Sequence, residues 1–193
     1  MAQDLIRPAT YADLEAVPPH LVAEIIFGRL ETHPRAVPKH ATAHASLANE
    51  LIGPFQKARG GPGGWVFMTE PELHLGPHVI VPDLAAWRVD RMPHLPPTAF
   101  IEMAPDWVCE LLSPSTLNRD RGPKRRIYGS FGVGYLWLLD ATAKVLEVFA
   151  LRQMQWVLHD THVDPDEVRA PPFDAVPFSL SALWPLPDAP DQS

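Results

Sequence analysis

The chain has 193 residues, enough for a sizeable core, and we expect a single domain over residues 1–184. Its hydrophobic share of 46% and charged share of 20% are typical of a soluble globular protein. The net charge of −7 argues against a general nucleic-acid coat protein, and no apolar run approaches the length of a membrane span. The lone cysteine, Cys109, excludes an intrachain disulfide and fits a reducing, cytoplasmic setting.

The N-terminal third predicts a short helix, a β-hairpin and a longer helix. Thr10 and Asp13 have the spacing of a capping box, which predicts a short helix to about residue 17. Residues 21–31 predict a hairpin that turns at Phe27-Gly28. After Pro38, apolar residues and histidines recur at helical spacing until a glycine-rich run ends the helix.

The remainder predicts apolar strands with one more helix between them. Helices interleaved with a central group of strands indicate an α+β (α/β) protein with a mixed β-sheet flanked by helices. The expected elements are strands at 65–68, 72–75, 79–87 and 107–112, a helix from about 116 to 131, strands at 135–139, 145–150 and 155–159, and a frayed tail at 185–193.

Two acids lie inside apolar runs that read as buried strands. They are Asp83, after His78-Val79-Ile80-Val81-Pro82, and Glu110, within Trp107 to Leu112. A buried carboxylate is costly unless a cation, a proton or hydrogen-bond donors compensate it. If the two strands are neighbours, both carboxylates can bind one Mg²⁺ or Mn²⁺ ion, which prefers oxygen ligands and keeps positions open for water and phosphate.

A helix after Ser113 supplies a cation near these acids. Lys124 shares one helix face with Ile127 and Tyr128, so its amine can reach the site and stabilise a phosphate in the transition state. Four arginines on the same segment predict a short basic patch that could hold a DNA backbone; they are Arg119, Arg121, Arg125 and Arg126.

Three further residues are candidates of lower specificity. Glu24 is an acid on an apolar hairpin strand and could bind a second cation or hold a water. His40 and His44 lie on one helix face, but the glutamate of a zinc-protease motif does not follow His40. We therefore expect His44 to pack in the fold and His40 to have a substrate or supporting role.

Several of these residues together carry a resemblance to a known family. The quoted stretches are Pro82-Asp83, the run from Val108 to Thr116, Asp120 with Lys124 and Tyr128, Gly132-Val133, and Trp137-Leu138-Leu139-Asp140. Together they resemble the Uma-type family of bacterial restriction-endonuclease-like proteins in the PD-(D/E)xK nuclease superfamily. The resemblance implies a restriction-endonuclease-like core, one Mg²⁺ or Mn²⁺ site, a DNA substrate and a homodimer.

The resemblance also implies a role for each matching residue. Asp83 and Glu110 match the metal ligands, Lys124 the catalytic lysine, Glu24 the early acid, and His40 a histidine at the start of the long helix. The simple superfamily signature has lysine two residues after the second acid, where this chain has Leu112. The catalytic lysine must therefore come from the following helix.

Structural explanations compete with these functional ones. Asp83 could cap a turn or pair with Arg88, Lys124 could extend its amine to water, and the arginines could form a solvated helix end. The leading hypothesis is a Mg²⁺-dependent DNA endonuclease. The alternatives are a non-catalytic module that binds DNA or protein or dimerises, and a hydrolase of small phosphorylated substrates.

Overall fold

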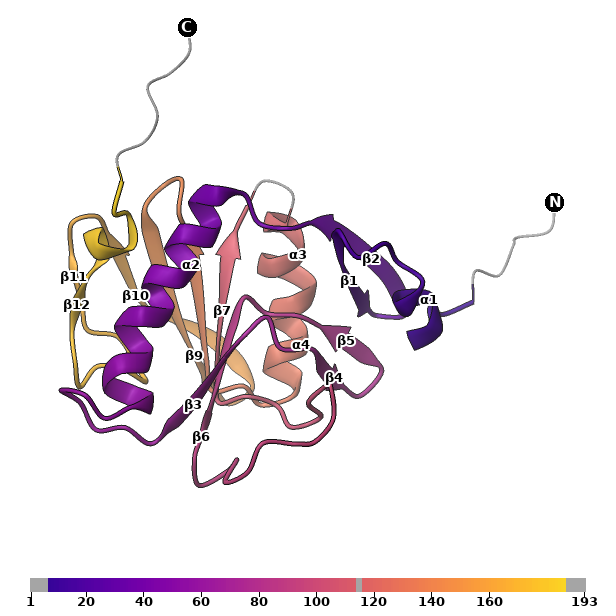
Figure 1. Ribbon diagram of the computed structural model, residues 1–193, viewed down its shortest axis with the longest axis horizontal. Helices are drawn as coiled ribbons and strands as arrows, with labels where there is room; N and C mark the ends of the chain where they lie inside the picture. The colour runs from indigo at the N-terminus through magenta and orange to yellow at the C-terminus, as the bar shows by residue number, and fades with distance from the viewer. Residues whose placement is uncertain (1–6, 114–115, 187–193) are drawn as a thin grey trace, which may run out of the picture.

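The computed structural model describes residues 7–113 and 116–186, and its largest element is a six-stranded mixed β-sheet (Figure 1). β7 and β8 pair in parallel, whereas the other neighbouring strands pair antiparallel, so the mixed α+β class is confirmed. In sheet order the strands are β10 Gln155–Val163, β9 Val145–Arg152, β8 Tyr135–Asp140, β7 Trp107–Leu112, β6 Leu84–Arg88 and β3 Trp65–Thr69.

A second, four-stranded sheet lies at the right in Figure 1 and includes the predicted hairpin. The hairpin turns at Phe27 and Gly28, whose φ angles of 49° and 75° lie in the left-handed region that glycine adopts most easily. The short helix α1, Tyr11–Glu15, precedes the hairpin and begins with the predicted capping box at Thr10. In sheet order the strands are β2 Arg29–Pro34, β1 Leu21–Ile26, β5 His78–Ile80 and β4 Leu73–Leu75.

Helix α2, Pro38–Leu51, covers one face of the large sheet and continues into the π-helical turn η1, Ile52–Gln56. Its buried side chains, including Leu47 and Leu51, pack in one cluster with Trp107 of β7. The apolar spacing in this part of the sequence therefore correctly predicted both the helix and its buried face.

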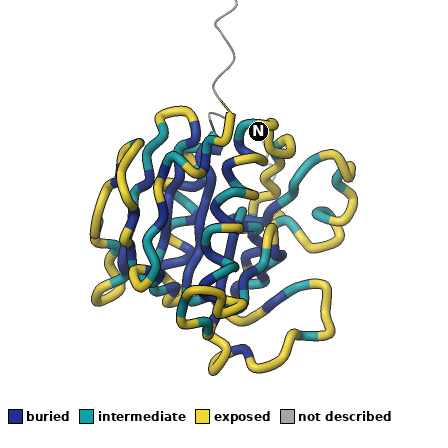
Figure 2. The backbone as a smooth tube through the Cα atoms, turned by 60° about the vertical axis from the view of Figure 1, so that its left-hand side comes forward, coloured by how far each residue is buried: buried dark blue, intermediate teal, exposed yellow. Residues whose placement is uncertain are grey.

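The opposite face is covered by a helical segment of three parts, α3 Leu117–Arg119, η2 Asp120–Lys124 and α4 Arg125–Ser130. Ile127 and Tyr128 pack there against Val108 and Leu112 of β7, which alternate with the residues that face α2. The strands between the two helical layers are therefore buried, as the dark blue segments of Figure 2 show.

The prediction of one strand over residues 79–87 is wrong. β5 ends at Ile80 in the small sheet and β6 begins at Leu84 in the large sheet. Between them, Pro82 has no N–H to donate to a strand partner, and the chain crosses from one sheet to the other. Asp83 therefore lies at a junction between sheets, and not on a continuous strand face shared with Val79 and Val81.

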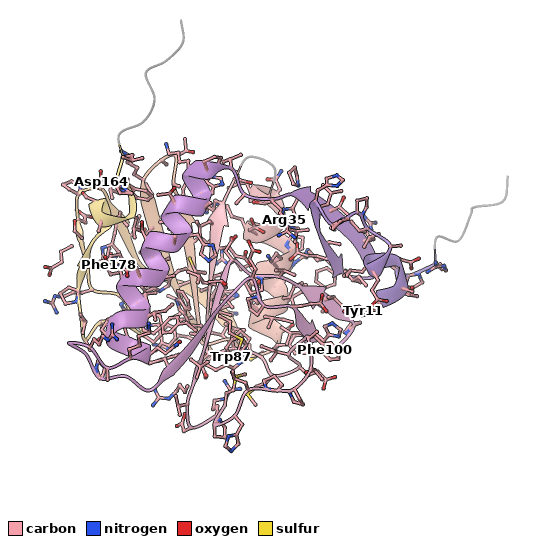
Figure 3. All side chains as sticks on the ribbon, viewed as in Figure 1. Tyr11, Arg35, Trp87, Phe100, Asp164 and Phe178 are labelled. Atoms are coloured by element: carbon pink, nitrogen blue, oxygen red, sulfur yellow. The ribbon has the colours of Figure 1, made fainter. Side chains whose placement is uncertain are left out.

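The C-terminal part contains elements that the sequence pattern did not indicate. β11, Glu167–Val168, pairs with β12, Phe178–Ser179, and the short helix η3, Leu180–Leu183, follows. Phe178, labelled in Figure 3, lies on the same side of the molecule as α2. The segment extends the core cluster beneath α2. Residues 187–193 of the predicted tail lie outside the described residues.

Candidate active site

Charged side chains gather where β1, the junction between β5 and β6, β7 and η2 meet. A buried charge is costly unless it is paired and hydrogen-bonded, so a cluster of such groups is a candidate functional site. Four of them are almost fully inaccessible to solvent: Glu24 is 0% exposed, Lys124 1%, and Glu110 and Asp120 2% each.

Lys124 is the central cation of this cluster. Its Nζ lies 2.8 Å from Glu110 Oε1 and 3.1 Å from Glu24 Oε1, and it donates a hydrogen bond of 3.0 Å to the Val81 carbonyl. Burial opposes ionisation of this amine, but the neighbouring acids outweigh burial and raise its pKa above the usual value. The alternative in which the amine of Lys124 extends to water is therefore wrong.

Glu24 is the ionised partner of Lys124. Its Oε1 accepts a hydrogen bond of 2.8 Å from the Val81 N–H, and its Oε2 lies 3.2 Å from Arg119 Nε. Burial favours the neutral acid, but the attraction of Lys124 and Arg119 outweighs burial and lowers the pKa of Glu24. Arg119, expected in a surface patch, is thus part of the buried cluster, and its side chain is only 13% exposed.

Glu110 lies in β7, between Lys124 and Tyr128. The Tyr128 hydroxyl donates a hydrogen bond to Glu110 Oε1, the same oxygen that lies next to the lysine amine. Burial raises the pKa of Glu110 to about 8 although Lys124 acts in the opposite direction. Burial thus disfavours the charged form of Glu110 more strongly than the neighbouring lysine favours it.

Asp83 lies beside Glu110, immediately before the neighbouring strand β6. The antiparallel register pairs Leu84 with Cys109, and Asp83 Oδ2 accepts a hydrogen bond of 2.6 Å from the Leu111 N–H. Burial is the largest cause that raises the pKa of Asp83 to about 6. The negative charge of Asp83 and Glu110 is thus only partly compensated when both are ionised.

Two residues of the cluster were not predicted as site residues. Asp120 Oδ1 lies 3.8 Å from Lys124 Nζ and 3.6 Å from Arg119 Nε, and Tyr128 holds Glu110 as described. Both lie four positions from Lys124, one on each side, and so share its helix face. That spacing was the signal in the sequence that could have identified them.

A pocket of about 260 Å³ opens above the cluster. Its floor includes Asp83, Glu110 and Lys124, and its walls come mainly from the end of β2, the segment before α2, and α2 itself. Burial lowers the pKa of both His40 and His44, which line this pocket as neutral imidazoles at pH 7. The remaining wall residues include Val22, His33, Pro34, Arg35, Val37, Glu70, Leu111 and Thr116.

The family model Uma2, described as "Putative restriction endonuclease", matches residues 8–182. This chain belongs to the Uma2 family. The comparison thereby confirms the resemblance inferred from the sequence. No curated protein matches the chain.

The Uma2 fold of this chain is also found in a solved structure. A crystal structure described as that of a "putative nuclease belonging to DUF820 from Anabaena variabilis ATCC 29413" has a TM-score of 0.73 and 21% sequence identity. The match covers 91% of this chain and 97% of that chain, so the likeness extends over nearly the whole fold. Among the described residues of this Uma2 chain, no helix is both long and apolar enough to cross a membrane.

The other three arginines of the predicted basic patch lie apart from the buried charge cluster and its pocket. Arg121 forms an ion pair with Glu147 of β9, and the guanidinium of Arg125 lies 4.3 Å from the centre of the Phe149 ring. Arg126 lies 5.3 Å from the centre of the Phe27 ring. These three side chains contact different elements and do not line the pocket with Arg119.

The carboxylate oxygens of the buried charge cluster are suitable ligands for a divalent metal ion. Within residues 7–113 and 116–186, however, no group of three or more candidate ligands is already arranged around a metal position. The four acids Glu24, Asp83, Glu110 and Asp120 face the two cations Lys124 and Arg119, which leaves a formal charge of −2 when all are ionised. Carboxylate oxygens are the ligands that Mg²⁺ and Mn²⁺ prefer.

Proposed function

We propose that this protein is a divalent-metal-dependent endonuclease that hydrolyses phosphodiester bonds in DNA. Membership of the Uma2 family supports a nuclease, and the buried charge cluster supports its chemistry. The observation that carries the proposal is the position of Lys124, whose amine contacts both Glu24 and Glu110 at the floor of a pocket that Asp83 also lines. A purely structural ion pair would not require Asp83, Glu110 and Asp120 to line the same open pocket as the lysine.

In this proposal Asp83 and Glu110 hold Mg²⁺ or Mn²⁺. Their raised pKa values have a common cause, because both carboxyl groups are buried with too little positive charge nearby. When bound, a divalent ion compensates this charge, lowers the pKa of a water molecule and offsets the charge of the phosphate. Tyr128 keeps Glu110 in one orientation by hydrogen bonding.

Lys124 acts as the fixed cation beside the scissile phosphate. Its amine stays protonated because Glu24 and Glu110 raise its pKa, so it can stabilise the negative charge that develops on the phosphate. Glu24 and the Val81 carbonyl hold the amine in place. Glu24 is thus a positioning residue, and Lys124 replaces the lysine that the simple superfamily signature has at the position of Leu112.

The experiment is Mn²⁺- or Mg²⁺-dependent nicking of plasmid DNA by the wild type and by the isosteric variants Asp83→Asn and Glu110→Gln. We expect each variant to lose at least about 100-fold in rate while it keeps the circular dichroism spectrum of the wild type. Arg59→Ala, a change at an exposed arginine after η1, is the control and should cleave normally. Nicking at the wild-type rate in both acid variants would reject the assignment.

A second candidate is a non-catalytic module that binds DNA or a protein, or that forms a homodimer. The observation that favours it is that the described residues have no preassembled group of three metal ligands, while Lys124 is already neutralised by acids. Calorimetric titration with Mn²⁺ separates the two functions. A nuclease of the proposed kind binds the ion at one site that Asp83→Asn weakens, whereas a binding module does not need the ion.

A further inference from the structure

A second hollow of about 250 Å³ adjoins the pocket of the candidate active site, which measures about 260 Å³. The second hollow extends away from the acids, toward Leu14 and Val17 at the N-terminal helix. The two hollows share four lining residues, so together they form one groove that runs along β1 of the small sheet. The shared residues are Val22, Arg35, Glu70 and Val81.

Arg35 and Glu70 form an ion pair at the boundary between the hollows. Arg35 Nη1 lies 3.6 Å from Glu70 Oε2, and Arg35 Nη2 donates to the Pro19 carbonyl at 3.3 Å. The two side chains are 59% and 47% exposed, and ion pairs this exposed contribute little to stability. Arg35 is labelled in Figure 3, where the chain passes from the hairpin to α2. Because the ion pair is so exposed, little free energy is lost when Arg35 leaves Glu70 for another anion.

The backbone of Glu70 contacts Asp83, one of the two candidate metal ligands. Its backbone N–H donates a hydrogen bond of 2.9 Å to the Asp83 carbonyl. Its φ angle of 47° lies in the left-handed region, where a non-glycine residue is strained. The pair is thus positioned next to the proposed point of cleavage.

We propose that an unpaired strand of DNA runs along this groove and that Arg35 exchanges Glu70 for a phosphate of that strand. The inference deepens the proposed nuclease function and rests on it. A guanidinium suits this exchange because its planar fork binds phosphate and carboxylate in the same geometry. The strand then places one phosphate at Asp83 and Glu110 and the adjacent one at Arg35.

The size and walls of the groove favour an unpaired strand over a duplex. Each hollow lies just below the range of small-molecule sites, so it accommodates about one nucleotide and not the side of a double helix. Val22, Pro34, Val37 and Leu111 give the first hollow apolar walls, which suit the face of an unstacked base. In a duplex these base faces stay stacked against each other.

Among the residues that line the second hollow, Arg35 is the cation, and Glu70 and Glu72 are the acids that could compete for it. Glu72, the other acid on the second hollow, already accepts a hydrogen bond of 2.8 Å from the Tyr11 hydroxyl and lies 2.7 Å from His74 Nε2. Glu70 is therefore the acid that competes with a strand for Arg35. Removing its charge should make the arginine more available.

The test is the binding of a fluorescein-labelled single strand, and of the duplex of the same sequence, followed by fluorescence anisotropy in EDTA and again in Ca²⁺. We expect the single strand to bind more tightly. Arg35→Ala should weaken its binding by about tenfold and reduce the slope of log Kd against log salt by about 0.7. The matched control Arg59→Ala removes the same charge outside the groove and should have little effect.

Glu70→Gln provides an independent test with the opposite sign. It should strengthen single-strand binding by about two- to fivefold, because an exposed competing ion pair is lost. Tighter binding of the duplex, equal effects of Arg35→Ala and Arg59→Ala, or no strand binding in either buffer would overturn the inference. Strand binding through Arg35 without any cleavage would instead reject only the hydrolytic function, because neither buffer requires turnover.

Discussion

At the scale of single residues, Lys124 offsets part of the negative charge of the buried cluster. It has acids on either side, and its amine is enclosed by Glu24, Glu110 and the Val81 carbonyl. Removing one partner from a buried ion pair leaves the other charge without compensation, which costs more than the pair contributed. The same amine is proposed to act on the phosphate, so its loss should affect both stability and catalysis.

Lys124→Met tests this double role. We expect the free energy of unfolding to fall by about 3 kcal/mol near pH 8, and less near pH 5, because there the buried carboxyl groups can take up protons. Without the lysine their folded-state pKa values rise above the unfolded values, so stability is retained at low pH and lost as pH rises. Urea denaturation at both pH values measures the effect.

Lys57→Met is the matched control, since Lys57 is exposed after η1. It should change the free energy of unfolding by less than about 0.5 kcal/mol at either pH. A Lys124→Met protein as stable as this control near pH 8 would show that the buried carboxylates do not need the amine.

The raised pKa values of Asp83 and Glu110 predict that metal binding depends on pH. Their pKa values are about 6 and about 8, so below these values an incoming cation must displace protons. The Kd for Mn²⁺ should therefore fall as pH rises from about 6 to about 8, by up to about tenfold per pH unit. Calorimetry in buffers of different ionisation enthalpy measures both Kd and proton release. A pH-independent Kd without proton release would contradict this prediction.

Among the site residues, those whose apolar surroundings conflict with their charge were predictable from the sequence. Glu24, Glu110 and Lys124 are charged residues in apolar patterns, and the structure brings them together. Arg119 could not be separated from its neighbours Arg121 and Arg125 by sequence, because its partner Glu24 is distant along the chain. Arg35 gave no signal, because it lies in an irregular segment where no periodicity applies.

At the scale of elements, the short crossing from β5 to β6 positions much of the site. Its Val81 contributes an N–H to Glu24 and a carbonyl to Lys124, and Asp83 follows two residues later. The small sheet must therefore stay in place against the helical segment that holds Lys124. Phe131, at the end of α4, lies against Gly76 in the turn between β4 and β5 and helps to hold the small sheet in place.

Gly76→Ala tests the importance of that contact. Gly76 has a φ of 60°, and a Cβ atom there would lie 2.9 Å from Phe131 Cζ. We expect the substitution to lower the free energy of unfolding by about 1–2 kcal/mol. Gly53→Ala is the control, because a Cβ there meets no atom within 4 Å and helix propensity favours alanine. Equal stability of both variants in urea denaturation would contradict this account of the turn.

Most elements were predictable because their patterns are local. The apolar stripe of α2, the hairpin turn at Phe27 and Gly28, and the buried strand β7 each have a characteristic spacing. The break after Ile80 was missed because apolar residues stand on both sides of the crossing, at 79–81 and again at 84–87. The strands β11 and β12 have two residues each and are too short to show a periodic pattern.

At the scale of the whole molecule, the net charge of −7 limits how DNA can be bound. Long-range attraction to a polyanion is weak, so binding must depend on local cations and on the metal ion. The homodimer implied by the family resemblance stays a prediction, which sedimentation of the purified protein can test. The proposal nevertheless depends on one property of the folded chain: Asp83 and Glu110, which are distant in sequence, lie close enough to bind the same divalent metal ion.

The most direct test of this property is a crystal structure of the protein soaked in Mn²⁺, with the ion located by its anomalous scattering. We expect one Mn²⁺ ion bound by carboxylate oxygens of both Asp83 and Glu110, within the pocket that Lys124 lines. A soaked crystal in which Mn²⁺ binds elsewhere, or in which this pocket has no anomalous peak, would contradict it.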